Sequence, residues 1–404
     1  MQKRFTPDAG GVFPEWEEIE FGKLFQRRSE KNGEEFGVDK TISVATMHFK
    51  PEGNKADEKS LPKYKVMRTG DIAFEGHINK HFKHGRFVLN DIGDGIISPI
   101  FEVLQPVSEL SKEVPGFWKY YINYEPVMGK ILAKCANTGI MMNRLSIKDF
   151  YKQKIKVPCI EEQRKIAAAL AAYDEMIAVK TAKLETWQEC KKRMVKEIFG
   201  RTKRFRDDDG NEFPEWEEKT LGEISEPLKY GMSAAAVKYD GENKYLRITD
   251  IDESSRKYVS DKIVSPEASK VAEKFLVQKN DLLFARTGAS VGKTYLYDEA
   301  DGKMYYAGYL IKAHIKPEYD SQFIFQLTLT DEFKKWIKKE SMRTAQPGIN
   351  AECLTKYKMM IPCMKEQQKI GSFLAEIDKE IEIQKEFIKT YAEGKKRMMR
   401  ELME

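Results

Sequence analysis

The segment from Phe284 to Thr294 has the residue types that hold phosphate groups in nucleotide-binding loops. It contains Gly288 and Gly292, and the second glycine is followed by Lys293. Three residues separate the two glycines, whereas the loop that wraps a nucleotide phosphate with its backbone amides needs four. The shorter spacing argues against a nucleoside triphosphatase, and an NTPase using residues 284–294 is an alternative with little support.

The same segment has the composition of a loop that lies against DNA. Arg286 and Lys293 are suited to contacts with phosphate or with guanine. Thr287 and Ser290 are small and polar, which allows the backbone to approach a nucleic acid closely. We therefore expect DNA contacts from these four residues.

Two further loops carry side chains that contact base edges. Asn, Gln and Arg make two-pronged hydrogen bonds with adenine or guanine. The loop at 341–348 offers Arg343, Thr344 and Gln346, and its counterpart in the first half offers Asn137 and Thr138, with Asn143 and Arg144 just beyond. An ordinary polar loop explains any single one of these residues at least as well.

Three histidines, His77, His81 and His84, lie close together and raise the question of a metal site. No cysteine or carboxylate stands at a matching spacing, and the same stretch contains cationic residues. A basic patch that faces DNA is therefore favoured over a zinc site. Its candidate contacts are Lys80, Lys83 and Arg86.

No motif for catalysis accompanies these loops. The sequence has no glycine-rich dinucleotide fingerprint, no Asn/Asp-Pro-Pro-aromatic tetrad for methylating an extruded base, no convincing nuclease core and no helicase motif. We therefore expect a binding protein that is not an enzyme and needs no cofactor or metal.

The composition is that of a folded, well-solvated protein. Hydrophobic residues make up 41% and charged residues 33% of the chain, and the net charge of +5 permits a polyanionic partner without requiring one. The five cysteines form no CxxC pair, and reduced thiols are expected. The start lacks the apolar region of a secretory signal, and acidic residues interrupt the most apolar helical stretch. These features predict a cytoplasmic protein without a membrane partner.

The positions of the candidate loops follow from an internal repeat. The hexapeptide Phe-Pro-Glu-Trp-Glu-Glu at 13–18 recurs at 213–218, an offset of 200 residues. Near the end of each half, residues 158–166 recur at 362–370, an offset of 204, and Lys-Lys-Arg-Met at 191 recurs with the same offset. We interpret the hexapeptides as packing staples where each globular domain begins, and not as a site.

Between these constant frames the two halves diverge. Gly70-Asp71-Ile72 aligns with 280–282 at an offset of 210, and Gly139, Ile140 and Leu145 align with Gly348, Ile349 and Leu354 at 209. The interiors read as short strands and turns, with strands expected at 72–74, 245–249 and 281–284. The chain is thus a frame, a variable interior and a helix, each present twice.

Residues 160–199 are predicted to form one long helix. Pro158 precedes it, Glu161 and Glu162 lie in its first turn, where the helix dipole favours acidic residues, and Gly200 follows as a stop. Its apolar residues recur with the steps of a heptad repeat: Ile166, Leu170, Tyr173, Ile177, Leu184, Trp187, Met194 and Ile198. The second copy repeats this seam with Ile370, Leu374, Ile377, Ile381, Ile388, Tyr391, Met398 and Leu402.

Two such seams in one chain most simply bury each other as an antiparallel coiled coil. This predicts an α+β fold in which two similar globular domains, 1–157 and 201–361, are joined by two long helices, 158–200 and 362–404, with pseudo-twofold internal symmetry. Helices of this length, without insertions, would fix the distance between the two domains. A structural coiled-coil adaptor that reads no DNA is the alternative.

The chain resembles the specificity subunits of type I restriction-modification enzymes over essentially its whole length. The most specific matches are Ile155–Gln163 and its echo Ile361–Gln367, and the segments 70–74, 246–250 and 280–288 are also typical. The segment 246–250 adds Arg247 to the candidate DNA contacts. The sequence departs from an even repeat in one respect, because the first interior has no clear counterpart of the 286–294 loop.

The resemblance implies a function and a set of partners. In that family two target-recognition domains each read one block of a split double-stranded DNA sequence, and the helices set the spacer between the blocks. The helices also dock two methyltransferase subunits, and a separate motor-nuclease subunit joins for cleavage. The resemblance therefore implies a split, asymmetric target.

Overall fold

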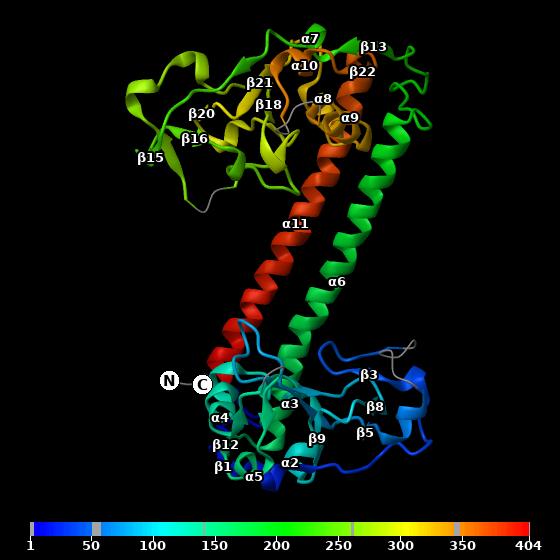
Figure 1. The fold of residues 1–404 in the computed structure, drawn as a ribbon, viewed down its shortest axis with the longest axis vertical. Helices are drawn as coiled ribbons and strands as arrows, with labels where there is room; N and C mark the ends of the chain where they lie inside the picture. Colours follow the sequence, from blue (N-terminus) through cyan, green and yellow to red (C-terminus); the bar gives the residue numbers. More distant parts are fainter. Residues whose placement is uncertain (1–3, 51–57, 140–141, 260–261, 343–347, 404) are drawn as a thin grey trace. The chain divides into compact units, whose positions relative to one another are not determined.

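The computed structural model describes residues 4–50, 58–139, 142–259, 262–342 and 348–403. The chain forms two compact units: unit 1 comprises residues 1–179 and 387–404, and unit 2 comprises residues 180–386. Each unit contains one α+β globular part and a portion of each long helix, α6 (Ile160–Phe199) and α11 (Met364–Met403) (Figure 1). Within the described residues no helix has an apolar stretch long enough to cross a membrane.

The globular part of unit 1 consists of short strands and short helices. Its strands are β1 (Glu17–Glu20), β2 (Phe25–Arg27), β3 (Ile42–Ser43), β4 (His48–Phe49), β5 (Lys65–Met67), β6 (Ile72–Glu75), β7 (Arg86–Leu89), β8 (Gly95–Ile97), β9 (Glu102–Pro106), β10 (Ala136–Asn137), β11 (Arg144–Leu145) and β12 (Lys154–Val157). Its helices are α1 (Phe21–Leu24), η1 (Val38–Lys40), η2 (Glu58–Lys63), α2 (Glu109–Lys112), α3 (Pro115–Tyr121), α4 (Glu125–Cys135) and α5 (Ile147–Tyr151).

The globular part of unit 2 has a similar order of elements. Its strands are β13 (Glu217–Thr220), β14 (Lys229–Tyr230), β15 (Ala236–Lys238), β16 (Lys244–Leu246), β17 (Val264–Pro266), β18 (Asp281–Ala285), β19 (Thr294–Leu296), β20 (Met304–Tyr306), β21 (Leu310–His314) and β22 (Lys358–Ile361). Its helices are α7 (Leu221–Ile224), η3 (Ile248–Asp250), η4 (Ala268–Lys270), η5 (Glu273–Phe275), η6 (Gly288–Ser290), η7 (Glu299–Asp301), α8 (Ser321–Thr328), α9 (Asp331–Ser341) and α10 (Ala351–Thr355).

The central sheet is the same in both units. Unit 1 orders four antiparallel strands as β2-β9-β6-β7, and unit 2 orders four antiparallel strands as β14-β21-β18-β19. The outer strands differ, because β5 pairs with β8 in an antiparallel manner whereas β16 pairs with β20 in parallel. The shared sheet therefore carries peripheral structures that are not alike.

The repeated hexapeptides close each globular part and hold the first turn of its long helix. In unit 1 the indole of Trp16 donates to the buried Glu162 carboxylate at 3.1 Å, and the guanidinium of Arg4 lies 2.7 Å from the same carboxylate. The same contacts recur in unit 2 at 3.2 and 2.9 Å, between Glu366 and the side chains of Trp216 and Arg204. The hexapeptides thus act as the packing staples that we expected.

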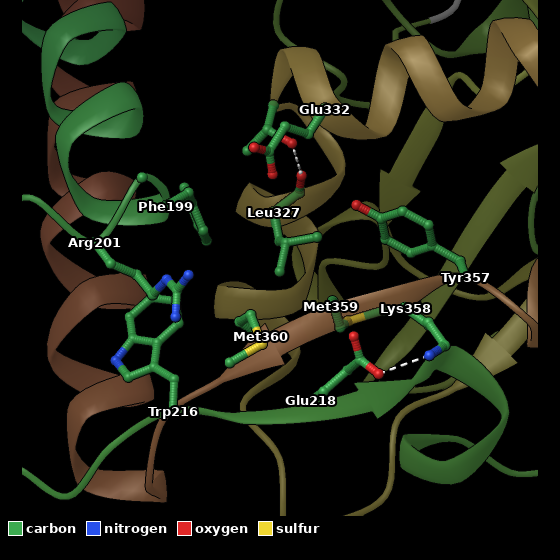
Figure 2. Close-up of a pocket in the computed structure, with 12 residues that line it drawn as sticks. Phe199, Arg201, Trp216, Glu218, Leu327, Glu332, Tyr357, Lys358, Met359 and Met360 are labelled. Atoms are coloured by element: carbon green, nitrogen blue, oxygen red, sulfur yellow. Dashed lines mark hydrogen bonds and ion pairs between the residues drawn. The ribbon is translucent and has the colours of Figure 1, made fainter.

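A two-stranded ribbon follows each staple, β1 with β12 and β13 with β22. In Figure 2 the Lys358 ammonium of β22 reaches the Glu218 carboxylate of β13, at 2.7 Å. Because the two strands come from the beginning and the end of one half of the sequence, this ribbon closes the globular part. The long helix starts directly after it.

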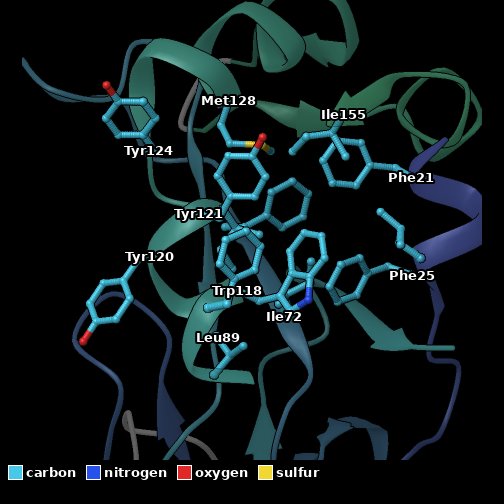
Figure 3. Packing of buried hydrophobic residues seen from close by; sticks show 14 of the residues in the cluster. Phe21, Phe25, Ile72, Leu89, Trp118, Tyr120, Tyr121, Tyr124, Met128 and Ile155 are labelled. Carbon is cyan, nitrogen blue, oxygen red and sulfur yellow. The ribbon is translucent and has the colours of Figure 1, made fainter. Parts of the chain in front are cut away.

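Aromatic side chains fill the core of unit 1. Phe25 and Trp118 meet edge to face with ring centroids 5.0 Å apart, and Phe21 stacks on Phe150 at 4.4 Å. Figure 3 shows this packing, with Ile72 of the central strand β6 in the same cluster. Each buried aromatic ring removes a large apolar area from water, so the sheet and the helices that cover it are strongly coupled.

The two predicted long helices are present. Helix α6 begins at Ile160 and ends at Phe199, as its caps indicated. Within unit 1 the ring of Tyr173, near the start of α6, meets that of Tyr391, near the end of α11, at 6.4 Å. Within unit 2 the late α6 residue Ile198 shares a buried cluster with Ile370 at the start of α11. The helices therefore run antiparallel in each unit.

Lysines at two seam positions form matching ion pairs. Lys191 lies 2.6 Å from Asp378 in unit 2, and Lys395 lies 2.5 Å from Asp174 in unit 1. Each lysine and each aspartate is separated from its twin by 204 residues. Charged pairs at seam positions favour one register of a coiled coil over its alternatives, so the repeat fixes the helix register twice.

The structure corrects two details of the sequence reading. The strand expected at 245–249 ends at Leu246, because residues 248–250 form the short helix η3. The alignment of Leu145 with Leu354 is also wrong. A Cβ at Gly22 would meet Tyr151, and one at Gly222 would meet Thr355, so the offset of 204 already applies before β12 and Leu145 corresponds to Ile349.

Candidate nucleic-acid interface

In unit 1 the loop between β6 and β7 carries the predicted basic patch. Lys80 and Lys83 are exposed, as a contact with DNA requires. Arg86 is half-buried, because its Nε donates to the Glu75 carboxylate at 2.7 Å and its Nη2 donates to the Ala45 carbonyl at 2.6 Å. We correct the prediction for Arg86: its guanidinium is used to hold the hairpin.

The histidines of this loop do not converge on a metal site. Nδ1 of His77 lies 3.3 Å from the Glu75 carboxylate, and the two residues lie on either side of the end of β6. In the part of the chain that the structure describes, no three His, Cys, Asp or Glu side chains are grouped as metal ligands would be. The five cysteines are free thiols.

The segment 136–144 lies beside the basic loop. The N–H of Asn143 donates to the Gly76 carbonyl at 2.9 Å, and its side-chain amide donates to the Lys83 carbonyl at 3.5 Å. Asn143 is only 7% exposed. We correct its prediction as a base contact, because the side chain joins the two segments. The exposed residues of this group are Asn137, Thr138 and Arg144.

Unit 2 builds its candidate site on a similar backbone contact. The N–H of Ile349 donates to the Arg286 carbonyl at 2.9 Å, as the N–H of Asn143 donates to the Gly76 carbonyl in unit 1. The two donors are not counterparts, because Ile349 corresponds to Leu145. Next to it, Thr287 forms an isolated antiparallel bridge with Gly348. Thr287 and Ser290 are half-buried beside this bridge. The predicted contacts Arg343, Thr344 and Gln346 lie outside the described residues.

We predicted Lys293 as a DNA contact, but its side chain makes contacts within the protein. The residue is 8% exposed, and its ammonium donates to the Ile251 carbonyl at 3.0 Å and lies 3.0 Å from the Glu253 carboxylate. An ammonium held in this way is not free to bind DNA phosphate. Nor does the loop lead into a helix, as a nucleotide phosphate loop does, because β19 begins at Thr294.

Arg247 is anchored by its own turn. Its Nε and Nη2 donate to the two carboxylate oxygens of Asp250 at 2.9 and 2.7 Å. The pKa of the Arg247 guanidinium is raised, mainly by this hydrogen bond. The prediction of Arg247 as a DNA contact is therefore weakened, because both prongs of its fork are occupied.

An open cavity of about 730 Å³ lies beside Arg286 in unit 2. Its lining includes Arg247, Arg286 and two tyrosines, Tyr230 and Tyr309, which are 40% and 64% exposed. The Arg286 guanidinium lies over the Tyr230 ring, 4.9 Å from its centroid. Sequence reasoning missed both tyrosines, because exposed and buried aromatic residues have the same appearance in a sequence.

A second cavity in unit 2, of about 210 Å³, lies where α6 ends (Figure 2). Its lining contains Arg201 and Lys358 but also Glu218 and Glu332. The positive and negative side chains offset one another, and Lys358 is already paired with Glu218. This cavity therefore lacks the excess of positive charge that a DNA-binding surface needs.

The family model for the type I restriction modification DNA specificity domain matches residues 103–186 and 214–390, more than half of the chain. The chain is similar to the type I restriction enzyme MjaVIII specificity subunit of Methanocaldococcus jannaschii, with 24% identity over 322 residues, 76% of this chain and 73% of the relative. A putative MjaX specificity subunit of the same organism is 26% identical over 215 residues, 51% of this chain and 49% of the relative.

Solved structures share the fold. The S subunit of a type I restriction-modification system from M. genitalium aligns with a TM-score of 0.66 and 15% identity over 99% of both chains. A chain from a structure that addresses complex assembly and conformational transition of the type I R-M system aligns with a TM-score of 0.51 and 17% identity, over 97% of this chain and 98% of that one. At these identities the likeness concerns the fold alone.

Proposed function

Because this chain belongs to the type I restriction modification DNA specificity family, we propose that it is the DNA-recognition subunit of a type I restriction-modification complex and catalyses no reaction itself. The accessible candidate residues support this role. They are lysine, arginine, asparagine and tyrosine side chains, which bind phosphates, base edges or base faces. The catalytic steps would belong to its partner subunits.

Each globular part would bind one block of a split, asymmetric DNA target. One observation carries this proposal: the two units place unlike side chains on one shared backbone position. Gly76 and Arg286 each follow a central strand and each accept a hydrogen bond from the segment before the last short helix. A reader without a side chain at that position and a reader with a guanidinium there would not select the same bases.

The long helices would dock two methyltransferase subunits, and a motor-nuclease subunit would join for cleavage. Two apolar residues three positions apart on α6 support such docking, since Met176 and Val179 are 38% and 55% exposed. A contiguous exposed apolar patch marks a site of protein–protein interaction. The relative M. jannaschii proteins are named as subunits of restriction enzymes, which supports the same assembly.

The test is the methylation pattern of a host that expresses this chain with its methyltransferase subunit. We expect one bipartite, non-palindromic methylated motif, and no methylation when the chain is absent. Binding to a duplex with that motif should also fall steeply with salt, because lysine and arginine release counterions from DNA. A complex that methylates no bipartite motif and binds DNA without salt dependence would support the coiled-coil adaptor instead.

A further inference from the structure

Arg286 occupies a rigid position at the end of the central strand of unit 2. It follows β18 directly, its N–H donates to the Tyr309 carbonyl at 3.0 Å, and its carbonyl accepts from Ile349 at 2.9 Å. The backbone is therefore held on both sides. A side chain that starts from a fixed backbone loses less freedom when it binds a ligand.

The guanidinium of Arg286 makes a cation–π contact. It lies over the Tyr230 ring at 4.9 Å, and the Tyr230 hydroxyl accepts a hydrogen bond from the N–H of Ala351 at 3.0 Å. Attraction to the face of an aromatic ring restrains the position of the guanidinium. Its Nε is buried and has no hydrogen-bond partner among the described residues, although a buried donor is normally paired.

The other cations near this cavity are already paired. Both prongs of Arg247 are bound by Asp250, and Lys293 is buried against the Ile251 carbonyl. Of the two arginines that line the cavity, Arg247 is thus paired with Asp250, whereas Arg286 has no carboxylate partner among the described residues. The remaining described residues of the lining are uncharged, so this part of the cavity offers fewer cations than a phosphate-binding surface.

The corresponding position in unit 1 excludes a side chain. A Cβ built on Gly76 would lie 2.0 Å from the Asn143 carbonyl oxygen, far closer than real atoms approach. The carbonyls of Gly76 and Arg286 thus both accept from the segment before the last short helix, but only Arg286 carries a side chain.

We propose that Arg286, held over Tyr230, is a specificity-determining residue that reads a guanine through its O6 and N7 acceptors in the half of the target bound by unit 2. This inference rests on the proposed function. Arginine forms two parallel hydrogen bonds with these two atoms, and the fork of Arg286 is oriented and unpaired. The ligand class is a G·C pair at one defined position of that half.

The test uses the complex with its methyltransferase subunit and a duplex that contains its methylation motif. The half-site of unit 2 is the half that changes when residues 201–361 are exchanged for those of a relative. Each guanine of that half is then replaced in turn by 7-deazaguanine, which pairs normally with cytosine but lacks N7. We expect wild-type affinity to fall at one position, by about tenfold to about a hundredfold.

Arg286→Lys keeps the charge but loses the fork, so it should weaken binding to the unmodified duplex and show no further loss with 7-deazaguanine at that position. Tyr230→Phe keeps the stacking ring and should behave like the wild type there, and circular dichroism checks that both variants fold. The inference is overturned if no guanine position is sensitive, if the half-site has no G·C pair, or if Arg286→Lys weakens binding to every sequence equally. A wild-type complex without a bipartite motif would instead refute the proposed function, and this inference with it.

Discussion

At the level of single residues, the two units pair an equivalent buried aspartate with different cations. A buried aspartate precedes or begins each central strand, Asp71 in unit 1 and Asp281 in unit 2. Asp71 is paired with Arg28 at 2.5 Å, whereas Asp281 is paired with Lys312 at 2.9 Å. Burial raises the pKa of Asp71. A buried charge needs a partner, but the scaffold does not prescribe which cation supplies it.

Lys293 offers a direct test of structural against DNA-binding roles. Lys293→Met removes the ammonium that holds the Ile251 carbonyl, so we expect the free energy of unfolding to fall by about 1–3 kcal/mol. The salt dependence of DNA binding should stay unchanged. Urea unfolding and binding titrations measure the two quantities, and the exposed Lys238→Met serves as a control for stability. Unchanged stability with a shallower salt dependence would restore Lys293 as a phosphate contact.

Arg68 makes the stability of unit 1 dependent on acid. Its hydrogen bond is the main cause of the lowered pKa of Glu30, whose ordinary value is 4.5, and the backbone of Thr69 is the main cause of the lowered pKa of Asp94. Because these carboxyls have lower pKa values in the folded state, their stabilisation is present above the ordinary pKa and is lost as the pH falls below it.

We therefore expect Arg68→Met to be less stable than the wild type at neutral pH and to lose less stability on acidification. Urea midpoints measured from about pH 6 to about pH 3 cover the relevant interval. Since Glu30 and Asp94 are partly exposed, the difference should shrink in high salt. Parallel pH curves for both proteins would contradict this account.

At the level of elements, the helices are bound most firmly where they pack on a globular part. Leu374 of α11 is fully buried in the core of unit 2, whereas Leu184 of α6 is only half-buried in the same cluster. Leu374→Ala should therefore cost about 2–5 kcal/mol of unfolding free energy, and Leu184→Ala about 1 kcal/mol. Urea denaturation of the two variants makes the comparison, and equal losses would contradict it.

The idea that the helices set the spacer remains a prediction, and a heptad insertion tests it. Seven residues inserted after Thr181 and after Lys385, which are 204 residues apart, keep the seam in register and lengthen each helix by about 10 Å. The methylated motif should then gain about three base pairs of spacer, or methylation should be abolished. An unaltered spacer would show that the helices do not determine it.

At the level of the whole molecule, constant frames surround unlike interiors. The staples, the ribbons that close each globular part and the central sheets recur, while the outer strands and the residues beside the candidate sites differ. The repeated parts thus provide the contacts that hold each globular part together. The variable parts are free to differ, as the proposed recognition of two different DNA blocks requires.

An exchange of one globular part tests this modularity. Residues 201–361 are replaced by those of a relative that retains the counterparts of Arg204 and Trp216, so that the contact with Glu366 is preserved. We expect one half of the methylated motif to change and the other half to stay as it is. Methylome sequencing measures the outcome, and a change in both halves would contradict the separation of the two readers.

The sequence by itself determined the repeat and the long helices. These depend on local periodicity and on capping residues next to each helix end, which are visible in a single stretch of chain. The helix from Ile160 to Phe199 was therefore predicted to the residue. The strand after Lys244 was predicted too long, because the turn that ends it depends on the side-chain bond between Arg247 and Asp250.

Only the tertiary structure decided which of the candidate cations are already paired within the protein. Arg286 and Lys293 are seven residues apart in one loop and were equivalent candidates by residue type. Their fates differ because the Ile251 carbonyl, forty-two residues away, takes the Lys293 ammonium, while Tyr230 places its ring under Arg286. The burial and pairing of a side chain are set by partners distant in the chain. Composition and spacing therefore identify the candidate loop but not which of its side chains is accessible.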